Sequence, residues 1–260
     1  MGDLSASVRL KLDRANEHAE AIRLLIAAWE DPKPYAFVTE VDEQSDGRFT
    51  RFRYLIRIYR PLPADALSKA LGDCIHNFRC VLDHLVWELS VEHSGDPPPK
   101  PTGVSFPGNA SGQRPPGLHA VHPHVVAEVK RLHIDHTGHD PACPPLWMLC
   151  QLSNMDKHRA IHAVFHWARS VDVKVVPSIR GTRIEVVDRP TLEGDAVVLA
   201  RVAVPRPLLH RQEVYVNSRT EHGIAIAETA RTPVAHLGMT VTGIKKAVED
   251  AAERLRHLLP

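Results

Sequence analysis

The stretch LGDCIHNFRCVLDHLVWEL, Leu71–Leu89, decides how the chain folds, because it reads as part of one long amphipathic helix. Its apolar residues recur every three or four positions, which places them on one side of the helix. They are Leu67, Leu71, Cys74, Phe78, Leu82, Leu85 and Leu89. The opposite side carries titratable groups, with Arg79 and His84 at its two edges. Exposed helix faces rarely carry Cys and Trp, so this face, which includes Cys80 and Trp87, is expected to be partly buried against a polar segment.

A second segment with unusual chemistry is LWMLCQLSNMDKHRAIHAVFHWAR, which predicts a helix from Leu146 to Arg169. Four consecutive ionisable residues, Asp156 to Arg159, interrupt its otherwise apolar composition. A groove lined by histidines from this segment is expected to face Arg79, Asp83 and His84. The two segments are therefore predicted to lie side by side in the folded molecule.

The rest of the chain alternates between helical and strand-like patterns. The periodicities predict a helix at 4–30, a β-hairpin at 35–60, a helix at 64–92, a proline-rich loop at 94–117, helices within 118–169, an antiparallel β-meander at 170–230 and a helix at 233–259. Together these predict one α+β domain over residues 1–260, built as a bundle of about four long helices with an inserted hairpin and meander.

Composition excludes several classes of protein. Hydrophobic residues make up 43% and charged residues 24% of the chain, with a net charge of +1, so the total charge does not argue for a nucleic-acid partner. No apolar stretch is long enough to span a membrane, and the four cysteines form no C-x-x-C pair. A cytoplasmic protein is expected. The glycine-rich motifs that bind ATP or NAD are missing from the sequence, so no cofactor is predicted.

Two motifs resemble a pattern found in uncharacterised bacterial proteins. The pattern is HN-x-R-x-x-LDHL-x-W followed by N-x-DKHR, here in IHNFRCVLDHLVWEL and LWMLCQLSNMDKHRAI. The resemblance covers about Pro63 to Ile161, and these proteins are similar to the HEPN superfamily of compact helical bundles. It implies a homodimer, RNA as a partner, and a metal-independent endoribonuclease activity. The arginine and histidine of the superfamily correspond here to Arg79 and His84.

If the resemblance holds, the residue chemistry assigns the roles. His84 would transfer the proton, because an imidazole titrates near neutral pH, and Arg79 would hold the phosphate through its planar fork. Asp83 would orient an imidazole or pair with Arg79, and His158 would supply a second proton donor. The remaining candidates would contact the substrate; they are His76, Asn77, Asp156, Lys157 and Arg159.

Two alternatives use overlapping residues. In the first, the polar side chains form a structural network, with Asp83 paired to Arg159, in a non-catalytic protein that binds a ligand or partner. In the second, His158, His162 and His166 bind a metal ion for a hydrolase. Their spacing of four residues would stack three imidazoles on one helix face, and two histidines four apart are a known zinc-binding geometry.

Overall fold

A computed structural model of the chain describes residues 4–42, 46–109, 113–136, 144–157, 161–176, 179–187, 192–193, 195–206, 215–227 and 235–259; residues 165–176, 192–193 and 215–222 are described by their backbone alone. The described chain is α+β and divides into two compact units. The helical unit comprises Met1–Ile26, Pro63–Val164 and Ile224–Pro260, and the sheet unit comprises Ala27–Leu62 and Phe165–Gly223. The expected single domain over residues 1–260 remains a prediction.

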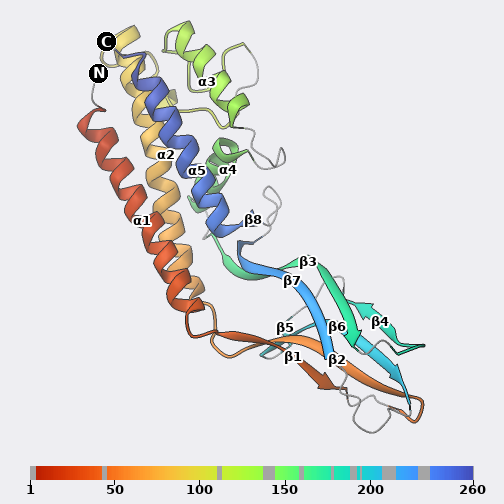
Figure 1. The fold of residues 1–260 in the computed structure, drawn as a ribbon. Helices are drawn as coiled ribbons and strands as arrows, with labels where there is room; N and C mark the ends of the chain where they lie inside the picture. Colours follow the sequence, from red (N-terminus) through yellow and green to blue (C-terminus); the bar gives the residue numbers. More distant parts are fainter. Residues whose placement is uncertain are drawn as a thin grey trace. The chain divides into compact units, whose positions relative to one another are not determined.

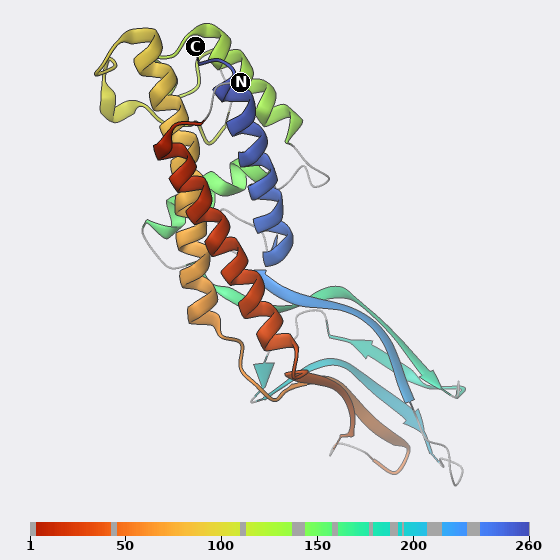
Figure 2. The same cartoon turned by 60° about the vertical axis from the view of Figure 1, so that its left-hand side comes forward.

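Five α-helices are described: α1 (Ala6–Glu30), α2 (Ala64–Ser94), α3 (Pro123–Asp135), α4 (Pro145–Asp156) and α5 (Leu237–Arg256); a short 3-10 helix spans Pro101–Gly103. In the helical unit, α1, α2 and α5 lie alongside one another, and the chain direction of α1 opposes that of the other two (Figures 1 and 2). The shorter α4 packs against both α2 and α5, while α3 packs on α5. None of the described helices is long and apolar enough to cross a membrane.

The helix α2 is the centre of this unit because it is buried on more than one side. Every residue of its predicted apolar stripe has at most 3% of its surface exposed, which confirms the stripe. Ile75, Val81 and Val86 lie outside the stripe and are also fully buried. On the α1 side, the Cys74 thiol lies 3.5 Å from the Ala15 carbonyl oxygen. A helix enclosed in this way leaves only part of its circumference for polar groups.

The hairpin prediction is confirmed: β1 (Tyr35–Val41) and β2 (Phe49–Ile58) pair antiparallel, from Tyr35 opposite Ile58 to Val41 opposite Phe52. Three further strands extend this sheet: β4 (Arg183–Val186), β5 (Leu192–Glu193) and β6 (Ala196–Pro205). The strand order is β1-β2-β6-β4, and β5 also pairs with β6. One face of β2 and β6 forms an apolar cluster that includes Tyr54, Ile56, Val202 and Val204.

The expected meander at 170–230 is wrong in its connectivity. The strand β6 pairs with β2, β4 and β5, whereas β3 (Ala163–Val176), β7 (Tyr215–Ile226) and β8 (Ala235–His236) form a second sheet in the order β3-β7-β8. A meander requires each strand to pair with its neighbour in sequence. Local patterns locate strands but carry no information on distant partners, so the order was not accessible from periodicity.

The predicted helix over Leu146–Arg169 is also wrong beyond its first half. The helix α4 ends at Asp156, and β3 begins at Ala163. The run from Ala163 to Val176 is rich in β-branched and aromatic residues, which favour a strand, and it pairs with β7. Pairing with a distant strand therefore overrides the helical spacing of the same residues.

The last predicted helix, α5, begins at Leu237 rather than at 233, and residues 231–234 lie outside the described residues.

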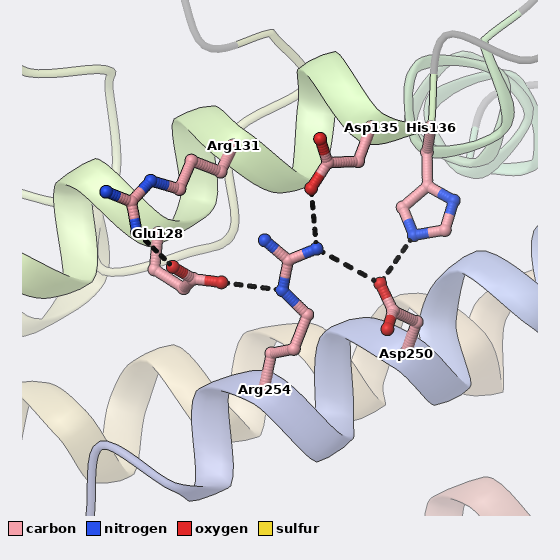
Figure 3. A network of polar contacts seen from close by, with 6 residues as sticks. All are labelled: Glu128, Arg131, Asp135, His136, Asp250 and Arg254. Atoms are coloured by element: carbon pink, nitrogen blue, oxygen red, sulfur yellow. Dashed lines mark hydrogen bonds and ion pairs between the residues drawn. The ribbon is translucent and has the colours of Figure 1, made fainter.

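An ion-pair network joins α3 to α5 and centres on Arg254 (Figure 3). The guanidinium of Arg254 contacts Glu128 at 2.6 Å, Asp135 at 2.8 Å and Asp250 at 3.4 Å. His136 approaches the same Asp250 oxygen at 2.8 Å. Burial opposes the charge on Arg254, but its hydrogen bonds to Asp135 and Glu128 outweigh burial and raise its pKa. A single cation thus holds three carboxylates together.

Replacing Arg254 should therefore destabilise the helical unit. We expect Arg254→Ala to lower the free energy of unfolding by about 1–3 kcal/mol, since hydrogen bonds to charged groups are lost and three carboxylates are left facing one another. Arg131→Ala is the matched control, because the Arg131 side chain is 71% exposed and its ion pair with Glu128 is long, at 3.5 Å. Its effect should be within about 0.5 kcal/mol. Urea unfolding of both variants checks this; equal losses would contradict it.

Candidate functional site

Arg79 and Asp83 lie one turn apart on α2 and form an ion pair, with Arg79 Nε 3.0 Å from Asp83 Oδ2. Together they hold both backbone polar groups of Phe106 in the proline-rich loop. Asp83 Oδ1 accepts a hydrogen bond from the Phe106 N–H at 2.8 Å, and Arg79 Nη2 donates to the Phe106 carbonyl oxygen. We call this arrangement of Arg79, Asp83 and Phe106 the loop clamp. It gives a loop without strand partners the hydrogen bonds that buried backbone requires.

Arg79 also reaches α4, where its Nη1 donates to the thiol sulfur of Cys150. The Arg79 side chain is only 15% exposed. Burial works against its charge, but Cys150 and Asp83 outweigh burial and raise the pKa of Arg79. Burial raises the pKa of Cys150 more than Arg79 lowers it, so the thiol is neutral at pH 7. Asp83, rather than Cys150, therefore supplies the charge that balances Arg79.

The aromatic ring of Phe106 fixes the loop to α3. Phe106 is fully buried and stacks on the imidazole of His133, with ring centroids 5.6 Å apart and an angle of 21° between planes. His133 Nε2 donates to the Pro107 carbonyl oxygen at 3.2 Å. Burial lowers the pKa of His133, which keeps the ring neutral near pH 7. The loop clamp therefore ties one loop to three helices, α2, α3 and α4.

His84 has different partners. Its Nδ1 lies 3.3 Å from the hydroxyl of Ser7 on α1. The neighbouring Glu88 accepts a hydrogen bond of 2.5 Å from Ser5, whose side chain also caps the first turn of α1. His84 thus helps to hold the start of α1 on α2, whereas the contacts of Arg79 run to α4 and the loop. The contacts described for Arg79 and for His84 have no residue in common.

The expected proximity of the two polar segments is confirmed at Asp156. A Cβ atom on Gly72 would lie 2.6 Å from Asp156 Oδ1, so the Asp156 carboxylate lies directly against the backbone of α2 at residue 72. Partial burial and then the nearby Asp73 raise the pKa of Asp156, while His76 opposes the shift. Asp73, His76 and Asp156 therefore form one exposed group across two helices.

The remaining candidates on these two helices differ in exposure. His76 is exposed, and its Nε2 lies 3.5 Å from the thiol of Cys80. Lys157 follows α4 and is also exposed. Asn77 is only 7% exposed, and its amide nitrogen donates to the Asp73 carbonyl oxygen at 2.8 Å. Asn77 therefore belongs to the interior of the bundle rather than to its polar surface.

The three-histidine metal alternative rested on a helix that the structure does not contain. His158 and Arg159 lie outside the described residues, so the expected Asp83–Arg159 pair remains a prediction. His162 precedes β3, and His166 lies within that strand, where only the backbone is described. The prediction that these three imidazoles stack on one face of a helix is therefore wrong. Across the described ranges, no group of three or more His, Cys, Asp or Glu side chains is arranged to hold a metal ion.

Sequence reasoning missed Phe106, His133 and Cys150 as members of the network. Two of them offer little signal, because Phe106 contributes through its backbone and Cys150 resembles an apolar filler. Comparisons of the chain with protein-family models, with curated proteins and with solved structures found no match. The resemblance to the HEPN superfamily therefore remains a prediction based on the motif residues.

Breaking the loop clamp should cost more stability than removing an exposed charge from the same helix. Asp83→Ala leaves Arg79 Nε and the Phe106 N–H without their acceptor and removes the carboxylate that balances the buried guanidinium, so we expect a loss of about 2–3 kcal/mol. Asp73→Ala, at an exposed position, should change stability by less than about 0.5 kcal/mol. Chemical denaturation of both variants measures the difference. A clamp of no structural importance would give two small, similar values.

The raised pKa of Asp156 predicts a pH-dependent effect of its replacement. The folded state binds the Asp156 proton more tightly than the unfolded state, so this group lowers stability as pH rises above about 4. Asp156→Asn removes that cost, and the variant should be more stable than wild type at pH 7. The difference should shrink as pH falls toward about 4. Melting temperatures across this range check the sign; a variant less stable than wild type at pH 7 would contradict it.

Proposed function

We propose that this chain is a non-catalytic protein that binds a ligand or partner, and that Arg79 and Asp83 maintain its fold. One observation supports this most directly. The charged ends of both side chains are occupied by the backbone of Phe106, by each other and by Cys150. Groups used in this way orient a loop and are not free to bind phosphate.

The catalytic alternative is the HEPN-like ribonuclease. Metal-independent RNA cleavage requires a base at the 2′-hydroxyl and a cation at the phosphate of the same nucleotide, within hydrogen-bond reach of both. Arg79 is mostly buried, and His84 bonds to Ser7 on α1. This geometry favours the structural role over catalysis by that pair.

The surface left for binding is the exposed polar group of α2 and α4. Asp73, His76, Asp156 and Lys157 are all exposed and carry both signs of charge. None of them takes part in the loop clamp, so a ligand or partner could engage them without opening the bundle. A homodimer, which the HEPN resemblance implies, would be one such assembly, and its mass in solution is measurable by light scattering.

An RNA-cleavage assay in EDTA separates the two functions. Single-stranded RNA is incubated with wild type, Arg79→Lys and His84→Ala, and the melting temperature of each protein is measured in parallel. We expect no cleavage above buffer by any of them. Cleavage by wild type that falls about 100-fold or more in His84→Ala, with unchanged melting, would overturn the proposal, because removal of a general acid or base costs that much.

A further inference from the structure

The outward face of the sheet in the sheet unit carries a row of arginines. Successive side chains of a strand point to opposite faces, so the residues next to the apolar cluster positions point away from it. On β2, β6 and β4 these outward positions include Arg51, Arg201 and Arg183. Arginines from three adjacent strands therefore share one face.

The strand register creates a hollow among these arginines. Ala203 on β6 lies opposite Arg51 of β2 on one side and opposite Arg183 of β4 on the other. A methyl group between two long side chains leaves space that a larger residue would fill. A pocket of about 280 Å³ occupies this position; it is lined by Asp42, Arg51, Arg183, Ile184, Glu185, Arg201, Val202 and Ala203.

The pocket is lined by three arginines, Arg51, Arg183 and Arg201, and by two carboxylates, Asp42 and Glu185. Arg51 pairs with Asp46 at 3.3 Å, and the Arg183 guanidinium lies over the Phe49 ring, 5.2 Å from its centroid. Within the residues that the structure describes, neither Arg183 nor Arg201 forms an ion pair. Arg201 stands opposite Arg53 across the β2–β6 ladder, where Arg53 pairs with Glu40, and opposite Glu185 across the β4–β6 ladder.

We propose that this pocket binds a small molecule that carries an oxyanion, either a phosphate or a carboxylate. Arg183 and Arg201 would hold the oxyanion, since guanidinium groups donate paired hydrogen bonds to both kinds of group. Asp42 and Glu185, at the same pocket, would accept hydrogen bonds from a hydroxyl or amine of the ligand. The volume suits a compact metabolite rather than a long chain. This site is separate from the loop clamp, so it goes beyond the proposed function and its test is independent of the RNA assay.

Calorimetric titration with pyrophosphate and, separately, with citrate tests the site at about 150 mM salt, where weak surface attraction is screened. We expect saturable binding of at least one probe to wild type. Arg183→Gln and Arg201→Gln should each weaken it by about tenfold or more, the size expected when a charge-assisted hydrogen bond is lost. Arg57→Gln is the matched control, because Arg57 is on the same sheet but pairs with Glu40 and Asp195 and does not line the pocket.

The outcomes distinguish the ligand classes. Binding of pyrophosphate alone supports a phosphate ligand, binding of citrate alone supports a carboxylate ligand, and binding of both supports the shared chemistry. Lack of saturable binding of either probe overturns the proposal. So does binding that survives in Arg183→Gln and Arg201→Gln, or that falls equally in Arg57→Gln, because the last result would reflect total charge. Equal melting temperatures of the three variants establish that all remain folded.

Discussion

The helical unit depends on one charged pair that binds both backbone polar groups of one loop residue, Phe106. Arg79 and Asp83 satisfy the N–H and C=O of Phe106, and residues 104–109 around it belong to no strand. Buried backbone groups without partners are costly, so a long loop can cross a helical bundle only where side chains replace the missing ladder. The central helix α2 supplies them because it contacts the bundle on several sides. This explains why Arg79 and Asp83 occur on a helix that is otherwise largely apolar on its packed sides.

The same arrangement explains how much of the fold was accessible from the sequence. Periodicity located α1, α2 and the hairpin because each depends on a local repeat of apolar residues. It failed at the end of α4 and in the order of the strands, where the outcome depends on pairing between β3 and β7 or between β2 and β6. Those contacts join strands that are far apart in the sequence, and no local pattern reports them.

Some features of the candidate site could likewise be predicted from the sequence, and others could not. Proximity of α2 and α4 could be predicted because both segments place ionisable groups on otherwise apolar helices. The Arg79–Asp83 pair could also be predicted, because the two residues are four apart on one helix. The contacts of both side chains with the backbone of Phe106 could not be predicted, because a backbone group carries no signal in the sequence. His84 shows the converse case: its neighbour in the sequence motif, Asp83, joins the clamp, while His84 contacts α1. Adjacent residues on a helix are about 100° apart, so a shared motif does not imply a shared site.

Cys150 gives the loop clamp a built-in chemical reporter. Cys150 is 3% exposed, its sulfur contacts Arg79 and the Pro107 carbonyl oxygen, and burial keeps it in the unreactive thiol form. Cys80, on the outer side of α2, is more accessible. A thiol reagent can therefore reach Cys150 only when the structure around it opens, whereas it reaches Cys80 more directly. The rate at which Cys150 is alkylated, relative to Cys80, measures how often the Phe106 loop lifts from the bundle under native conditions.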